Sequence, residues 1–254
     1  MRAKRTMVLY VVYRASTESK DRSTIPTRLK SLGCQQIHRA FWKIDEKKAQ
    51  QVLQILENNQ PILLKRLREI RNPNIAKKEQ FARLGSLIIV AFTLPKDANR
   101  EKVKNFLRKA PCIRLRRSVY AFSQKQSFYE KKPTLVDALK FINFIRENKG
   151  DVKIMSRVVV INAAGSETLI KETQEHIEKG ASDIVASCKE LYIKARAGND
   201  VGQLRERFSR IKRRFFILKK VASVYEVWLK TEFSKSLMKA YHALRKVYSV
   251  IGAK

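Results

Sequence analysis

The chain has 254 residues, 44% of them hydrophobic, and its 55 Lys and Arg residues against 23 Asp and Glu residues give a formal net charge of +32. This length and apolar fraction suffice for one large domain or two to three small ones, which excludes a disordered basic tail. No apolar run approaches the roughly 20 residues of a membrane-spanning helix, and the run of seven that ends at Tyr13 is too short for a signal peptide. We therefore expect a soluble, cytoplasmic protein.

The excess of positive charge points to a polyanionic partner. So many like charges repel one another in the folded state, and nucleic acid is the commonest ligand that neutralises them. A membrane-binding protein would carry its cations in one polybasic tail or one amphipathic helix, whereas here they are spread from Arg2 to Lys254. The composition therefore predicts DNA or RNA as the partner and no membrane.

The cysteines do not suggest a disulfide framework or a metal site. Cys34, Cys112 and Cys188 are widely spaced, no CxxC motif occurs, and the chain has only 3 His residues. We interpret the three thiols as reduced, buried, small apolar residues.

The chain contains an internal repeat. The apolar segments 8–13 and 87–92 predict two buried strands that lie 79 positions apart. Segments 34–42 and 112–120 align residue for residue at an offset of 78 and predict a second pair of strands. Trp42 and Tyr120 occupy the same position of the two copies, so we expect both in the core.

Each copy continues in the same order, with a basic helix before the second strand and an amphipathic helix and a last strand after it. The helices and last strands are predicted at about 23–32 and 99–110, 45–58 and 134–148, and 62–71 and 152–162. This order is the ferredoxin-like plan: strand, helix, strand, a short or merged third strand, helix and strand.

Several strands are apolar at consecutive positions, which requires that both faces of the sheet be covered. Helices cover one face of a ferredoxin-like sheet, and the other copy is the economical cover for the second face. We therefore expect an α+β fold in which two tandem ferredoxin-like domains, 1–80 and 81–162, pack as an intramolecular pseudo-dimer. Its two sheets would stack face to face about 10 Å apart.

Residues 163–254 predict a basic helical arm built as an antiparallel hairpin. A helix over about 167–197 is followed by a stop at Gly198 and a cap at Asp200. A heptad-like apolar seam then continues from Leu204. An unbroken helix of about 50 residues would form a rod near 75 Å long, unless the interruption near Phe233 bends it. A homodimer through this last helix is an open alternative.

The first copy resembles a known family. The resemblance lies in the order of four segments: Val8–Tyr13, a basic helix, the run Leu32-Gly-Cys-Gln-Gln-Ile-His-Arg-Ala-Phe-Trp42, and a helix that opens at Asp45. This order is similar to that of the small ferredoxin-like subunit of the CRISPR spacer-integration complex. The same module recurs in the C-terminal part of the phenylacetate-type repressors. The segment from about Leu87 to Arg196, with Pro95 and the run Arg117-Ser-Val-Tyr120, is similar to the N-terminal domain of the chromate-resistance protein ChrB.

The resemblance bears on catalysis. The integration-subunit family ends its first strand on an Asp implicated in metal binding and nuclease activity, and the matching positions here hold Arg14 and Thr93. An arginine cannot supply the oxygen ligand that a divalent metal needs for phosphodiester cleavage. We therefore expect no catalytic residues, no metal and no cofactor. A metal-dependent nuclease stays an alternative only if Asp21 or Asp97, in the loops after the first strands, served instead.

Three groups of cations are candidate phosphate contacts, because Arg and Lys side chains bind phosphate oxygens. The largest lies on the last helix beside the apolar seam, where acids are nearly absent. The others lie on the last strand of the first copy and the second strand of the second copy. In chain order the candidates are Lys65, Arg66, Arg68, Arg71, Arg114, Arg116, Arg117, Arg205, Arg207, Arg210, Lys212, Arg213, Arg214, Lys219 and Lys220. The alternatives are a solvated helix face and salt bridges inside the pseudo-dimer. Phe128 and Tyr129, in a connecting loop, are candidates for stacking on bases.

These observations predict a non-enzymatic protein that binds the phosphate backbone largely independently of sequence, since no recognition helix or zinc finger is visible. Double-stranded DNA is the first candidate, as the resemblance implies, and structured or ribosomal RNA is the second. We expect the protein in the nucleoid or at the ribosome. The similarity to ChrB implies a further alternative, an effector-responsive repressor.

Overall fold

The computed structural model describes residues 8–14, 23–70, 83–125, 127–130, 132–197 and 200–251. Its contacts divide the chain into two compact units. The first holds the described residues up to Val103, Cys112–Ser127 and Asp137–Ile170, and the second holds Lys104–Pro111, Phe128–Val136 and the described chain from Lys171 onward. Most of the two predicted repeats therefore lies in one unit, but residues 104–111 and 128–136 of the second repeat belong to the other.

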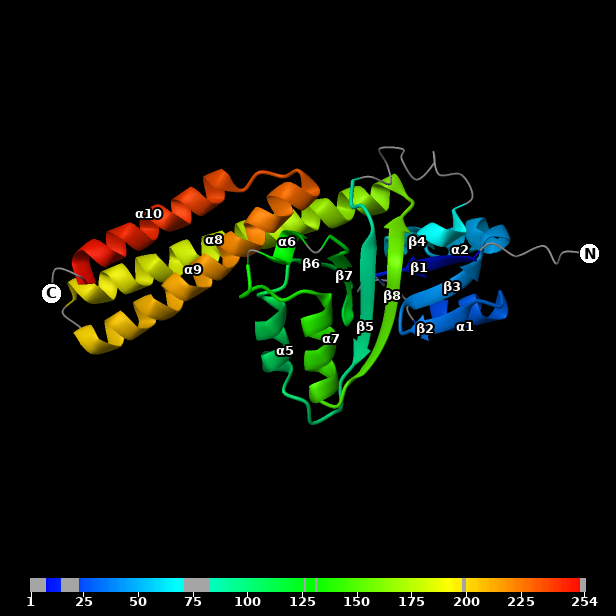
Figure 1. The fold of residues 1–254 in the computed structure, drawn as a ribbon, viewed down its shortest axis with the longest axis horizontal. Helices are drawn as coiled ribbons and strands as arrows, with labels where there is room; N and C mark the ends of the chain where they lie inside the picture. The colour runs from blue at the N-terminus through cyan, green and yellow to red at the C-terminus, as the bar shows by residue number, and fades with distance from the viewer. Residues whose placement is uncertain are drawn as a thin grey trace, which may run out of the picture. The chain divides into compact units, whose positions relative to one another are not determined.

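The first unit contains an antiparallel sheet of eight strands in the order β2-β3-β1-β4-β8-β5-β7-β6 (Figure 1). The strands are β1 (Val8–Val12), β2 (Gln35–His38), β3 (Phe41–Asp45), β4 (Ile62–Arg66), β5 (Leu87–Thr93), β6 (Cys112–Arg116), β7 (Val119–Ser123) and β8 (Asp151–Val160). Counted inward from its outer edge, one half has the order β2-β3-β1-β4 and the other β6-β7-β5-β8, so corresponding strands of the two copies take the same places. The third strand of each copy, β3 or β7, is a full strand that forms a hairpin with the strand before it.

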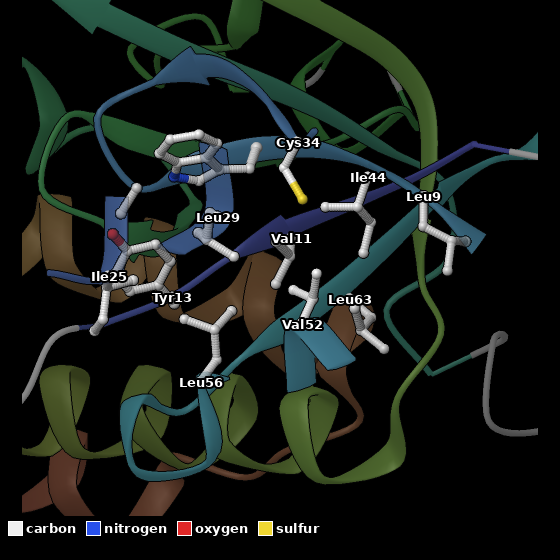
Figure 2. Close-up of a cluster of buried hydrophobic side chains, with 12 residues drawn as sticks. Leu9, Val11, Tyr13, Ile25, Leu29, Cys34, Ile44, Val52, Leu56 and Leu63 are labelled. Carbon is white, nitrogen blue, oxygen red and sulfur yellow. The ribbon is translucent and has the colours of Figure 1, made fainter. Parts of the chain in front are cut away.

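Helices pack on one face of each half. The helices of this part of the chain are α1 (Ile25–Ser31), α2 (Ala49–Ile55), α5 (Arg100–Leu107), α6 (Ser127–Glu130) and α7 (Ala138–Glu147), with short 3-10 helices η2 (Glu46–Lys48), η3 (Glu57–Asn59) and η4 (Leu67–Glu69). Alternate residues of β1, among them Val11, join Leu29 of α1 and Val52 of α2 in one apolar core (Figure 2).

The second half has an aromatic core under α7. Phe141 lies with its ring centroid 5.4 Å from that of Phe92 and 5.6 Å from that of Phe122. Asp137 starts the helix by accepting a hydrogen bond of 2.8 Å from the backbone N–H of Lys140. Trp42 is completely buried, as predicted, whereas Tyr120 is half-buried and packs beside Phe141 with a ring-centroid distance of 6.2 Å.

The sheet folds back on itself. Strands β1 and β6 are five places apart in the strand order, which is about 24 Å in a flat sheet. Yet the guanidinium of Arg14, at the end of β1, donates from Nε to the carbonyl of Leu115 at 2.8 Å and from Nη2 to that of Arg114 at 2.7 Å. His38 of β2 likewise lies with Nε2 3.2 Å from Oγ1 of Thr93 in β5. The two halves must therefore contact each other.

Folding back buries the apolar faces that point away from the helices. Tyr10 and Val12 alternate with the β1 residues that face α1 and α2, and they are 4% and 0% exposed. Ile89 and Ala91, which alternate with Phe92 in β5, are completely buried as well. Each half thus covers the other, as the runs of consecutive apolar residues require.

The prediction of two separate stacked sheets is wrong, because β4 pairs with β8 and joins the halves into one sheet. The last three residues of β8, Val158 to Val160, pair with β4, whereas most of the strand pairs with β5. A register shift and the left-handed conformation of Arg157, with φ 56°, mark the place where β8 changes partners.

The second unit is a bundle of three helices. Most of α8 (Ala163–Arg196) packs with α9 (Val201–Leu229) and α10 (Ser234–Ile251) around one apolar core, side by side in Figure 1. Asp200 caps α9 by accepting from the N–H of Gly202 at 2.8 Å. A Cβ on Gly180 would lie 3.2 Å from Leu218 Cδ1, so a glycine allows this close approach of α8 and α9.

The expected hairpin is present in α8 and α9, and the helix breaks between Leu229 and Ser234, so the interruption expected near Phe233 replaces the long rod. Lys230 takes a left-handed conformation, with φ 53°, and ends α9. Phe208 then meets Tyr248 and Phe215 meets Tyr241, with ring centroids 6.0 and 6.3 Å apart. Because the residue numbers run in opposite directions, α10 returns antiparallel along α9.

We predict that Arg14→Met destabilises the protein by about 1.5 to 3 kcal/mol, because two backbone carbonyls lose a charged donor while the aliphatic part of the side chain is kept. Urea unfolding measures the change. Arg117→Met, at an exposed turn position, is the matched control and should change stability by less than about 0.5 kcal/mol. Equal effects of the two variants would contradict the role of Arg14 in joining the halves.

We also predict a loss of stability on mild acidification that depends on His38. Burial lowers the pKa of His38 below its ordinary value of 6.5, and Arg39, Lys153 and Arg116 lower it further against a backbone hydrogen bond to Phe92. The stability from the neutral imidazole is therefore fully present above pH 6.5 and is lost as the pH falls through the lowered pKa. Unfolding at pH 7.5 and 5.5 should show a smaller difference for His38→Gln than for the wild type, and an unchanged difference would argue against this origin.

Candidate nucleic-acid interface

Charge is distributed unevenly over the helical unit. Helix α8 carries five Lys and Arg residues and six Asp and Glu residues, so its charges nearly balance. From Arg207 to Lys246 the chain carries twelve Lys and Arg residues and only two acids, Glu226 and Glu232. Because the apolar seam takes one side of α9, its cations gather on the remaining arc.

The predicted cations of α9 form one exposed basic surface. All eight are exposed, and seven of them belong to what we call the basic face: Arg205, Arg207, Lys212, Arg213, Arg214, Lys219 and Lys220. The eighth, Arg210, forms an ion pair with Glu206 one turn earlier. The exposure of all eight cations agrees with their predicted place on the solvent side of this helix, and Arg207 also interacts electrostatically with Glu190 of α8.

An open groove of about 610 Å³ lies on the basic face. It is lined by Lys109, Thr134, Ser209, Lys212, Arg213, Phe216, Ile217 and Lys220. The α9 members recur at intervals of three and four residues and so project from one side of the helix. The segments 104–111 and 128–136 of the same unit supply the other wall.

Hydrogen bonds fix the wall of the groove against α9. The backbone N–H of Val136 donates to the carbonyl of Lys109 at 3.0 Å and joins the two wall segments. Lys220 Nζ donates to Thr134 Oγ1 at 3.0 Å, and Lys132 Nζ donates to Ser223 Oγ at 2.6 Å. The spacing of cations across the groove is therefore held by the fold.

Phe216 is an exposed aromatic residue in this cationic groove, with 47% of its surface accessible. Its ring centroid lies 5.7 Å from that of Phe215, which is 3% exposed and packs on Tyr241. The buried ring thus supports the exposed one. An aromatic surface among cations can contact both the bases and the phosphates of a nucleic acid.

Sequence reasoning missed Phe216 and did not include Lys109 among the candidates. A signal for Phe216 was present, because consecutive helix residues are turned by about 100° and a ring next to Phe215 on the seam must fall on the basic arc. The predicted stacking residues Phe128 and Tyr129 are half-buried instead, and the hydroxyl of Tyr129 lies 3.5 Å from the carbonyl of Pro111.

The cations predicted on the second copy do not act together. Arg114 is exposed on β6 opposite Tyr120, and Arg117 is exposed in the turn after β6. Arg116 lies over the ring of Tyr13, 5.5 Å from its centroid, and donates to the carbonyl of Tyr13 at 3.4 Å. Its guanidinium therefore helps to join the two halves of the sheet.

The cations predicted on the first copy are also partly engaged. Lys65 forms an ion pair with Glu46 at 3.2 Å, and its side chain is only 13% exposed. Arg66 lies over the ring of Tyr10, 5.5 Å from its centroid. Arg68 is exposed, and Arg71 lies outside the described residues.

The positions discussed for catalysis serve the contact between the halves, since Arg14 donates to two carbonyls of β6 and Thr93 contacts His38. In the described part of the chain, no three His, Cys, Asp or Glu side chains gather as a metal-binding group. Asp97 is exposed after β5, and Asp21 lies outside the described residues.

The three cysteines are free thiols; Cys34 and Cys188 are buried, as predicted, and Cys112 is half-buried. Burial raises the pKa of Cys188 to about 11. Among the helices of the described residues, none combines the length and apolar character needed to span a bilayer. No protein-family model matches the chain, and searches of curated proteins and of solved structures gave no match.

Proposed function

We propose that the protein binds nucleic acid through the basic face of α9 and contacts the phosphate backbone largely without regard to sequence. The observation that carries this proposal is a set of seven exposed cations on one helix, three of which, Lys212, Arg213 and Lys220, line a groove that also contains the exposed ring of Phe216. Double-stranded DNA is the first candidate ligand and structured RNA the second.

The alternative interpretation is that the basic face is an ordinary solvated helix surface. Helices α8 and α9 of the same bundle can be compared to test it. A solvated helix usually mixes acids with bases, and α8 does so. Helix α9 packs in the same bundle but has no acid between Arg207 and Tyr225. Repulsion along this stretch raises the free energy of the folded protein, and a polyanion would remove that cost.

We further infer that each half of the sheet is a ferredoxin-like module. The support is the matching strand order of the two halves, with a helix after the first strand and another after the third. In this proposal the folded sheet is a rigid scaffold, and the helical unit carries the ligand.

The proposal predicts steep salt dependence. If some eight phosphates are neutralised on duplex DNA, the logarithm of the association constant should fall with the logarithm of the salt concentration at a slope of about −7. Fluorescence anisotropy with a labelled duplex of arbitrary sequence, titrated at several salt concentrations, measures the slope. A slope near zero would rule the proposal out, and tighter binding of a structured RNA would move the assignment to RNA.

A paired substitution localises the contact. The double variant Lys212→Gln, Arg213→Gln should reduce the magnitude of the slope by about 2, since each lost phosphate contact removes about 0.9. The control removes the same charge from α8, at exposed Lys179 and Lys189. Lys179→Gln, Lys189→Gln should leave the slope close to that of the wild type, and equal effects of the two double variants would show that only net charge matters.

A further inference from the structure

We propose that the groove on α9 holds an unpaired nucleotide of a polynucleotide strand, with Phe216 stacked on the base and cations of the groove on the flanking phosphates. The inference rests on the proposed function and deepens it by naming the ligand of one site. We then expect the protein to bind an unstacked base in the groove, in addition to contacting the phosphate backbone.

The exposed ring is the reason for this choice. Lys and Arg side chains suffice to bind the backbone of a duplex. A duplex presents the edges of its bases in its grooves, while the faces of the bases stay stacked inside. The face of Phe216 therefore finds a matching base face only where the strand is unpaired or the base is turned out of the stack.

The cations stand on both sides of the ring. Lys212 and Arg213 precede Phe216 by about one helical turn and Lys220 follows it by about one turn, so they lie roughly 5 to 6 Å along the axis in either direction. A base in a strand is likewise flanked by a phosphate on each side. Lys109 adds a fourth charge from the opposite wall.

The site is organised before the ligand arrives. Phe216 rests against buried Phe215, Lys220 is held by Thr134, and Ile217 adds apolar surface beside the ring. Since these groups are already ordered by the fold, little conformational freedom is lost when a nucleotide binds. Stacking of a base on an aromatic side chain strengthens binding by about 5- to 150-fold per base.

The experiment compares three ligands of equal length: a single-stranded 15-mer of DNA, a 15-mer of abasic deoxyribose phosphate with the same charge, and the duplex, whose two backbones carry about twice that charge. Phe216→Ala should weaken binding of the single strand by at least about fivefold and change binding of the duplex and the abasic strand less than about twofold. Phe216→Tyr should restore single-strand binding. Single-stranded RNA of the same sequence shows which sugar the groove prefers, and dependence on Phe216 with RNA also supports the inference.

Val227→Ala is the matched control, because Val227 is an apolar residue of α9 that is 68% exposed and lies outside the groove. It should leave all affinities unchanged, and thermal unfolding checks that each variant folds. Equal loss on all three ligands, or no loss with Phe216→Ala, overturns the inference. If Lys212→Gln, Arg213→Gln still weakens binding in that case, the proposed function stands and only the nucleotide site falls. Failure of the wild type to bind any of the ligands overturns both.

Discussion

Strands β1 and β5 are apolar on both faces, and the chain can bury all of these side chains only by bringing its two halves together. Helices cover one face of each half, and the other faces, with Val12 and Ala91 completely buried, have the opposite half as their cover. Polar groups then lock the closed arrangement. Arg14 donates to two carbonyls of β6, and Lys153 Nζ donates to the carbonyl of Ile37 at 2.7 Å. The arginine at the end of β1 is thus occupied by the fold.

The same arrangement sorts the cations of the chain by role. In the sheet unit, some cations make contacts within the protein: Lys65 forms an ion pair with Glu46, and Arg116 lies over the ring of Tyr13. In the helical unit, α8 balances its own charges, and the uncompensated cations remain on α9 and α10. A net charge of +32 is therefore a poor guide to position by itself. Contacts within the protein and burial decide which cations remain exposed to solvent.

Local patterns predicted the elements well and the long-range joins poorly. The repeat, the strands β1 and β5 and the seam of α9 follow from periodicity within short windows of sequence. The pairing of β4 with β8 and the return of α10 depend on left-handed residues at Arg157 and Lys230, and neither is the glycine or asparagine that would signal such a turn. Phe216 was missed for a related reason. Of the two adjacent phenylalanines, only Phe215 fits the seam, and the interpretation followed the seam.

The basic face and the apolar seam of α9 depend on each other. Cations around Phe216 repel one another, so the helix that carries them needs stabilisation from elsewhere. The opposite side of α9 provides it, because Ile211 and Phe215 are buried in a core shared with α8 and α10. The return of α10 therefore does more than shorten the arm. It packs aromatic side chains against α9 directly behind the groove, and this support lets a short stretch of helix hold an exposed ring and several like charges in a fixed arrangement.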